Sequence, residues 1–213
     1  MGVSRRWKLL KLQIDNLRKQ FLPNPFNPLG QYPNGRRVQA YTRAFLVLSH
    51  AEIETYLEDW AKDLARASEK AWTSPRKRVT MPMAFLLTSV AKRIEIPRTL
   101  SGPGSKDCPR QLAEVSVKLF QEFYRRVNDN NGIKERNVLT LFGPLGVPAS
   151  ALGSTLLPNL DNFGALRGIH AHHSAKAVPS VLDPDVEYRR VTALVDEIGP
   201  LDEWLVLYKR RIR

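Results

Sequence analysis

The stretch that decides the fold is AYTRAFLVLSHAEIETYLEDWAKDLARASEKAW, residues 40–72, which contains neither glycine nor proline. Counted from Arg37, this uninterrupted run spans 36 residues and is rich in good helix formers. At about 100° per residue, Tyr41, Phe45 and Leu48 share one apolar stripe. A second, displaced stripe follows, made of Ile53, Leu57, Trp60 and Leu64. We therefore expect one long helix that bends or meets different partners along its length.

Shorter helical segments surround this run. Apolar residues at spacings of three and four, together with helix-start signals, predict helices over residues 4–21, 83–94 and 110–128, within IKERNVLTLFGPLGV (133–147), and from Pro158 onward. Asp183 resembles the N-terminal cap of a further helix, which we expect to end at Gly199 and Pro200. Residues 201–211 would then form a separate final helix. No stretch shows the alternation of a strand. The predicted fold is all-α, an antiparallel helical bundle.

The loop LPNPFNPLGQYPNG (22–35) separates the first helix from the rest, because proline, asparagine and glycine favour turns. We assign residues 1–36 to an N-terminal helix and loop that pack on the bundle, and residues 37–213 to the helical domain. The lone Cys108 forms no intrachain disulfide, and no apolar run approaches the roughly 18–20 residues of a membrane span. We therefore expect a cytoplasmic protein without a membrane partner.

The net charge of the chain indicates the class of molecule that it binds. The chain has 33 Lys and Arg against 21 Asp and Glu, a net charge of +12, which attracts phosphate polymers. Nucleic acid is therefore favoured over acidic lipid as the partner. Among several basic patches, Arg76, Lys77 and Arg78 in the segment PRKR are the RNA contacts that we single out.

The stretch NLDNFGALRGIHAHHSAKAV, residues 159–178, holds three of the four histidines just after Arg167. His170, His172 and His173 point in different directions on a helix, so we expect no metal and no other cofactor. A polar helix end that faces water would also explain the pattern. Arginine beside histidine favours metal-free cleavage of RNA, because imidazole moves protons near neutral pH and guanidinium stabilises charge on a phosphate.

Three segments carry a resemblance to a known family. LRGIHAH (166–172) resembles the R-x4-6-H motif of the HEPN ribonucleases, with Arg167 and His172 in the motif positions. FLVLSHAEIETYLEDW (45–60) resembles the early long helix of the RiboL-PSP type of HEPN domain. NNGIKERNVLTLFGPLGV (130–147) resembles the segment before its motif helix, so the resemblance covers roughly residues 38–178.

This resemblance implies a HEPN-like bundle that forms a homodimer in which two motifs face each other and cleave RNA without a metal. The products would carry 2′,3′-cyclic phosphate ends, and the protein would act as a toxin or an antiviral defence effector, restrained by an antitoxin or a regulatory protein. On an ideal helix Arg167 and His172 point about 140° apart. A two-fold partner, or a kink near Gly168, would bring both to one phosphate.

The motif departs from the family at two positions. Gly168 stands where the family often has Asn, Asp or His, and the additional His170 lies only about 60° from Arg167 around the helix. The register of the family favours His172 as the proton-transfer group, whereas the geometry within one chain favours His170. We take Arg167 and His172 as catalytic, His170 as an auxiliary contact and His173 as the most dispensable.

Glu52 is a second auxiliary candidate. It falls on the continuation of the first stripe of the long helix, where it either pairs with Arg167 or lies half exposed. Two other functions compete with the ribonuclease. One is a HEPN-like module that binds RNA or protein without cleavage. The other is a DNA-binding helical protein, although no helix-turn-helix pattern is recognisable.

Overall fold

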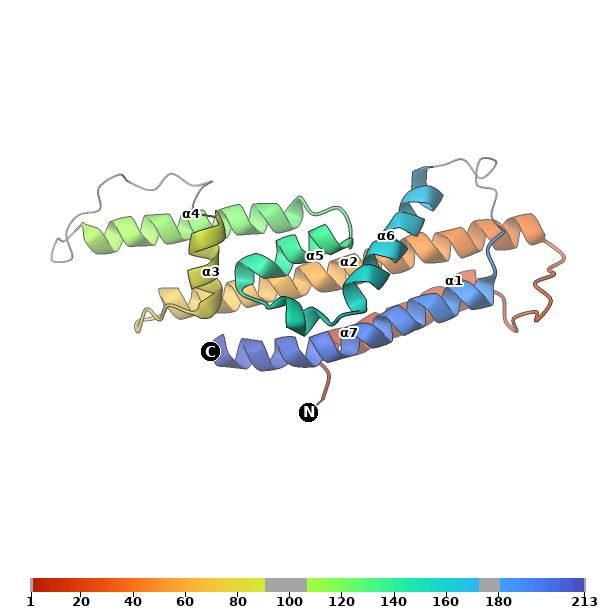
Figure 1. Ribbon diagram of the computed structural model, residues 1–213, viewed down its shortest axis with the longest axis horizontal. Helices are drawn as coiled ribbons and strands as arrows, with labels where there is room; N and C mark the ends of the chain where they lie inside the picture. Colours follow the sequence, from red (N-terminus) through yellow and green to blue (C-terminus); the bar gives the residue numbers. More distant parts are fainter. Residues whose placement is uncertain (1, 91–106, 173–180, 213) are drawn as a thin grey trace. The chain divides into compact units, whose positions relative to one another are not determined.

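The computed structural model describes residues 2–90, 107–172 and 181–212, and in these ranges the chain is all-α, as predicted, without a strand (Figure 1). The helices are α1 (Arg5–Phe21), α2 (Gly35–Thr73), α3 (Met81–Val90), α4 (Cys108–Asn128), α5 (Glu135–Phe142), α6 (Leu156–His172) and α7 (Pro184–Ile212). Two short 3-10 helices, η2 (Gly143–Leu145) and η3 (Ala149–Leu152), lie between α5 and α6. None of the described helices is both long and apolar enough to cross a membrane.

The chain divides into two compact units that alternate along the sequence. Unit 1 comprises Met1–Leu57, Asn131–Val138 and Ser150–Val206. Unit 2 comprises Glu58–Asn130, Leu139–Ala149 and Leu207–Arg213. The long helices α2 and α7 therefore supply residues to both units. The division of the chain after residue 36 stays a prediction.

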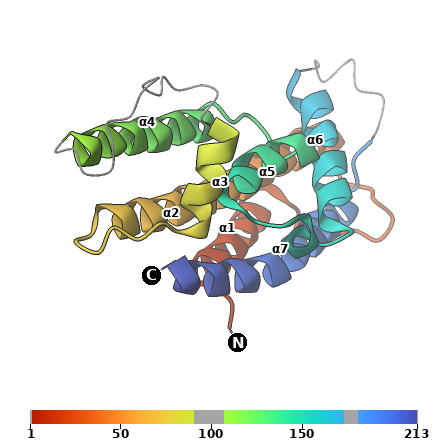
Figure 2. The same ribbon diagram turned by 60° about the vertical axis from the view of Figure 1, so that its left-hand side comes forward.

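In unit 1, α1 packs antiparallel against α7, and the two helices lie side by side in both views (Figures 1 and 2). The hydroxyl of Ser4 caps α1 by accepting a hydrogen bond from the backbone N–H of Trp7 at 3.0 Å. The indole N–H of Trp7 in turn donates to the carbonyl of Val195 at 3.0 Å. Further along, Lys11 pairs with Asp196 at 2.9 Å.

A buried carboxylate joins three helices of unit 1. Asp202 of α7 has no exposed surface, and its oxygens accept hydrogen bonds from the backbone N–H and hydroxyl of Ser4 and from the hydroxyl of Tyr56. These donors compensate the loss of water around the charge. In this unit α2 and α7 run in the same direction, since Phe45 lies 6.3 Å from Tyr188 between ring centroids and Tyr56 contacts Asp202. This pair is an exception to the expected antiparallel order.

The buried face of α2 differs from the two predicted stripes. Tyr41 and Leu48 are more than a third exposed, at 38% and 39%. The second stripe is buried, as predicted. The same face continues toward the start of the helix, one and two turns before Ile53, through four further buried residues: His50, Ser49, Leu46 and Phe45. One continuous face of α2 is therefore buried. The sequence pattern missed this because it counted apolar residues only, and Ser49 and His50 on this face are polar.

In unit 2, α4 runs antiparallel to the end of α2. The hydroxyl of Tyr124 donates to Glu69 at 2.7 Å, and the side-chain amide of Asn130 donates to Glu58 at 3.0 Å. Helix α3 packs against α4 and η2. The hydroxyl of Tyr208, near the end of α7, donates to the carbonyl of Leu145 at 2.7 Å and fixes η2.

The structure contradicts the predicted break at Gly199 and Pro200, because α7 continues through both residues. Proline inside a helix removes one backbone hydrogen bond at a cost of about 3 kcal/mol. Ile198 and Leu201 on either side are at most 1% exposed, so tertiary packing on both sides outweighs the local cost. At Gly199 an added Cβ would lie 3.7 Å from the indole of Trp7, which shows how closely α1 approaches here.

Candidate functional site: a cationic hollow beside Arg167

The predicted catalytic residues lie on α6, which ends at His172. Arg167 is described in full and is partly buried. The backbones of His170 and His172 belong to the last turn of α6, but their side chains lie outside what the structure describes. His173 lies outside the described residues.

One face of α6 lies against the segment that leads into α5. Gly164, Arg167 and Gly168 are three and four residues apart and therefore share this face. A Cβ at Gly164 would lie 3.0 Å from the side-chain Cγ of Lys134, closer than ordinary van der Waals contact, so glycine favours the close approach of the segment. At Gly168 an added Cβ would meet no atom within 4 Å. This difference leaves a hollow of about 160 Å³ next to Arg167.

Positive charge and hydrogen-bond donors line this hollow. Arg167 of α6 and two cations from the α5 side, Lys134 and Arg136, contribute to its wall. The side-chain amides of Asn131 and Asn137 add neutral polar groups. Among the described residues that line the hollow, none is Asp or Glu. Such a surface attracts an anion and has no acidic group to repel it.

Arg167 has an unused donor at this place. Its Nε atom is buried and has no hydrogen-bond partner. Buried polar groups in native proteins are almost always paired, and an anion in the hollow would balance the positive charge of this guanidinium. A phosphate oxygen is the partner that suits guanidinium best.

His50 of α2 also lines the hollow. Its side chain is 2% exposed, and its ring lies 6.1 Å from that of Phe163 on α6. Burial and, secondly, the positive charge of Arg167 lower the pKa of His50 from 6.5 to about 4. Its Nδ1 is 3.6 Å from a carboxylate oxygen of Glu54, beyond hydrogen-bond length. The imidazole is therefore neutral near pH 7.

The structure places the other predicted site residues elsewhere. Glu52 is half-buried and does not line the hollow, because it lies about 200° from His50 around α2. Arg76, Lys77 and Arg78 are exposed in the turn after α2, in unit 2. Arg78 lines a second hollow there, whereas its two neighbours do not.

Two parts of the hollow, His50 and the segment 131–137, were not singled out by the sequence pattern. His50 was detectable, since it lies one turn before Ile53 on the buried face of α2. The contribution of Lys134 and Arg136 was not detectable, because tertiary contacts alone bring them to α6. In the described part of the chain, no group of three His, Cys, Asp or Glu side chains is arranged to hold a metal ion.

Comparison with known proteins bears on this site. The family model described as RiboL-PSP-HEPN matches residues 4–201, which include all segments of the hollow. No curated protein and no solved structure matches the chain. The match covers most of the sequence and extends beyond the segments that carried the resemblance. The chain therefore belongs to the RiboL-PSP-HEPN family.

Proposed function

We propose that this protein is a metal-independent endoribonuclease and that the hollow beside Arg167 holds the phosphate at which RNA is cut. The observation that carries the proposal is the cationic lining, free of acidic groups among the described residues, around a buried guanidinium nitrogen without a partner. Membership of a HEPN family is consistent with ribonuclease activity.

The chemistry requires a group that stabilises charge on phosphorus and a group that moves protons. The ribose 2′-oxygen would attack the neighbouring phosphorus while the bond from phosphorus to the 5′-oxygen breaks, which leaves a 2′,3′-cyclic phosphate and a 5′-hydroxyl. Arg167 would bind the oxygens of the phosphate, where negative charge grows in the transition state. His172 would move the proton, with His170 as an auxiliary contact.

His50 supports this role of Arg167 by its neutrality. A carboxylate at this buried position would pair with the guanidinium and compete with the phosphate. A neutral imidazole fills the space and leaves the positive charge of Arg167 available. We assign His50 as a positioning residue, since it lines the same hollow as Arg167 from the buried face of α2.

A homodimer completes the proposed site. Arg167 and His172 lie about 140° apart on an ideal helix, so one straight α6 does not direct both at one phosphate. A second copy related by a two-fold axis would supply the missing group. The protein would then act in the cytoplasm as a toxin or an antiviral effector, and an antitoxin or a regulatory protein would restrain it.

The decisive experiment is incubation of purified protein with total RNA in excess EDTA, followed by analysis of the fragment ends. Wild type is expected to give cyclic-phosphate ends, and Arg167→Gln and His172→Ala to lose the activity by at least about a hundredfold. Arg189→Gln is a matched control, because it removes one exposed arginine from α7 and leaves the hollow intact. An all-deoxy oligonucleotide should remain uncut, since it lacks the nucleophile.

Three results would contradict the proposal. Equal cleavage of DNA would exclude attack by the 2′-hydroxyl. Absence of cleavage by folded, antitoxin-free wild type would exclude the enzyme, and retained RNA binding in that case would support the non-catalytic binding module. Loss of activity on addition of EDTA alone would show that the reaction needs a metal ion.

A further inference from the structure

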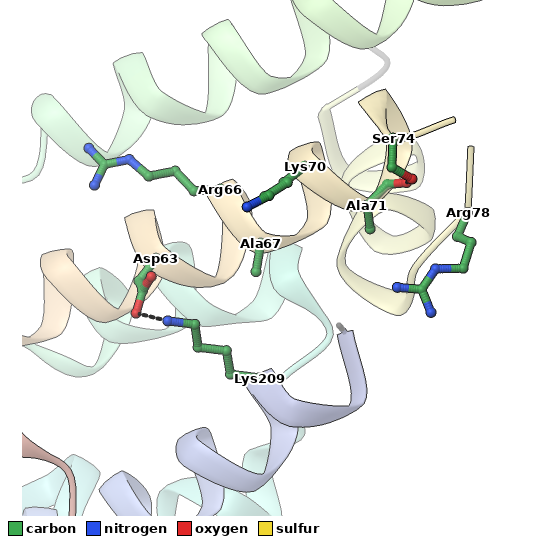
Figure 3. A pocket seen from close by; sticks show the side chains of 8 residues that line it. All are labelled: Asp63, Arg66, Ala67, Lys70, Ala71, Ser74, Arg78 and Lys209. Atoms are coloured by element: carbon green, nitrogen blue, oxygen red, sulfur yellow. Dashed lines mark hydrogen bonds and ion pairs between the residues drawn. The ribbon is translucent and has the colours of Figure 1, made fainter. Parts of the chain in front are cut away.

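Unit 2 contains a larger hollow, of about 650 Å³, at the end of α2 (Figure 3). Lys70 and Arg66 extend from α2, Lys209 reaches in from α7, and Arg78 comes from the segment after α2. It shares no residue with the hollow beside Arg167. We refer to this set of residues as the unit 2 groove.

The charge of the groove is strongly positive. Counting only the lining residues that the structure describes, four cationic side chains stand against one carboxylate, a net charge of +3. The carboxylate, Asp63, is already paired with Lys209 at 2.6 Å, as the dashed line in Figure 3 marks. In the described part of the chain, Lys70 and Arg78 have no ion-pair partner, and both are exposed. Their charges are available to a ligand.

The spacing of Arg66 and Lys70 on α2 does not stabilise the helix in the absence of a ligand. Arg66 and Lys70 are four residues apart on α2, and like charges at this spacing destabilise a helix. Glu69, the nearest acid along the helix, accepts the hydroxyl hydrogen of Tyr124 instead. The like-charged pair becomes favourable once an anion lies between its members.

The floor of the groove suits a polymer backbone rather than bases. Ala67 and Ala71 share one face of α2, and Ser74 follows the last residue of the helix. All three side chains are small, so a ligand can approach the helix closely. The hydroxyl of Ser74 is already donated to the carbonyl of Ala71 at 2.7 Å. Among the described residues that line the groove, none is an aromatic side chain on which a base could stack.

We infer that the unit 2 groove is a second binding site for RNA, which holds the phosphates of a single strand without regard to sequence. This inference rests on the proposed function for its choice of RNA among polyanions. Binding by Lys70 and Arg78 releases condensed counterions, so the affinity depends steeply on salt.

The test measures binding without cleavage. A fluorescently labelled single-stranded RNA with every ribose 2′-O-methylated is titrated with protein over a range of salt concentrations, and anisotropy gives the affinity. The variant Lys70→Gln/Arg78→Gln is expected to bind about tenfold more weakly at low salt. The slope of log affinity against log salt should become shallower by about 1.4, since each phosphate contact contributes about 0.7 for single strands.

Two controls separate the groove from general charge. Arg5→Gln/Lys8→Gln removes one arginine and one lysine from exposed positions of α1 and should leave the slope unchanged. Lys70→Arg/Arg78→Lys keeps both charges in the groove and should also retain the slope. Circular dichroism confirms that each variant is folded before the titration.

The inference is overturned if Lys70→Gln/Arg78→Gln keeps the wild-type slope, or if Arg5→Gln/Lys8→Gln loses as much slope. Because the methylated RNA has no nucleophilic hydroxyl, this measurement does not depend on catalysis. A wild type that cuts RNA while the groove variant binds normally would refute the groove alone. A wild type that cuts nothing while the groove variant binds weakly would refute the proposed nuclease alone.

Discussion

Protonation of His50 would place a second positive charge beside Arg167 in a nearly closed space. The pKa of His50 is about 4 in the folded protein against an ordinary value of 6.5 in the unfolded chain, so the unfolded chain takes up more protons between these values. His50 therefore contributes stability that is full above pH 6.5 and is lost as pH falls through about 4. We expect a loss on the order of 2 kcal/mol, discounted for solvent that reaches the ring through the hollow.

The measurement is urea unfolding of wild type and His50→Gln at about pH 7 and about pH 4.5. Other groups titrate in both proteins, so the difference between the two pH dependences isolates His50. Wild type should lose more stability on acidification than the variant. Parallel losses would show that His50 is not held neutral by the fold.

The two glycines of α6 that face the hollow should respond differently to alanine. At Gly168 an added methyl group meets open space, so Gly168→Ala should raise the free energy of unfolding by about 0.5–1 kcal/mol through helix propensity alone. At Gly164 the same methyl group would press on Lys134 at 3.0 Å, which should cancel most of that gain. Equal gains at both positions in urea unfolding would contradict this close contact.

At the scale of elements, the sequence predicted most helices because apolar periodicity and turn residues act locally. Asp183 caps α7 as predicted, since its carboxylate accepts the backbone N–H of Asp185 at 2.9 Å. The prediction failed where packing opposes local propensity, at Pro200. It also failed at His50, a polar residue on the buried face of α2, because the helix faces were predicted from apolar residues alone.

Pro200 offers a direct test of this competition. It is exposed, so Pro200→Ala leaves no cavity, and the variant regains the hydrogen bond from its N–H to the carbonyl of Asp196. We expect the free energy of unfolding to rise by about 1–3 kcal/mol. Chemical unfolding followed by circular dichroism measures it. A decrease would show that the packing of α1 on α7, through Trp7 and Val195, requires a proline-bent helix.

At the scale of the whole molecule, the sequence pointed to a candidate site but not to all the residues that line it. That Arg167 and His172, at motif spacing, bind and cleave at a phosphate stays a prediction. Nothing in NNGIKERN (130–137) indicated that this segment lies against α6, because that contact depends on the close approach at Gly164. The three-dimensional set of Lys134, Arg136 and Arg167 is therefore a property of the fold.

The proposed dimer predicts that two inactive variants restore RNA cleavage when they are combined. If Arg167 of one copy acts with His172 of the other, a heterodimer of Arg167→Ala and His172→Ala contains one site with both groups intact and one site with neither. Random pairing on co-expression should then restore roughly a quarter of wild-type RNA cleavage, although each variant alone is inactive. Differently tagged chains, purified over both tags, would give heterodimers with about half of the wild-type activity.

A purified heterodimer without activity would place both groups of each site in the same chain. The geometry of α6 then requires a bend near Gly168 that turns His172 toward Arg167, or else proton transfer by His170, which lies about 60° from Arg167 on the same helix. The variants His170→Ala and His172→Ala distinguish these two arrangements. If His170 transfers the proton, His170→Ala loses cleavage and His172→Ala retains it. Complementation in the heterodimer would instead establish that a two-fold axis brings the arginine of one α6 to the histidine of another.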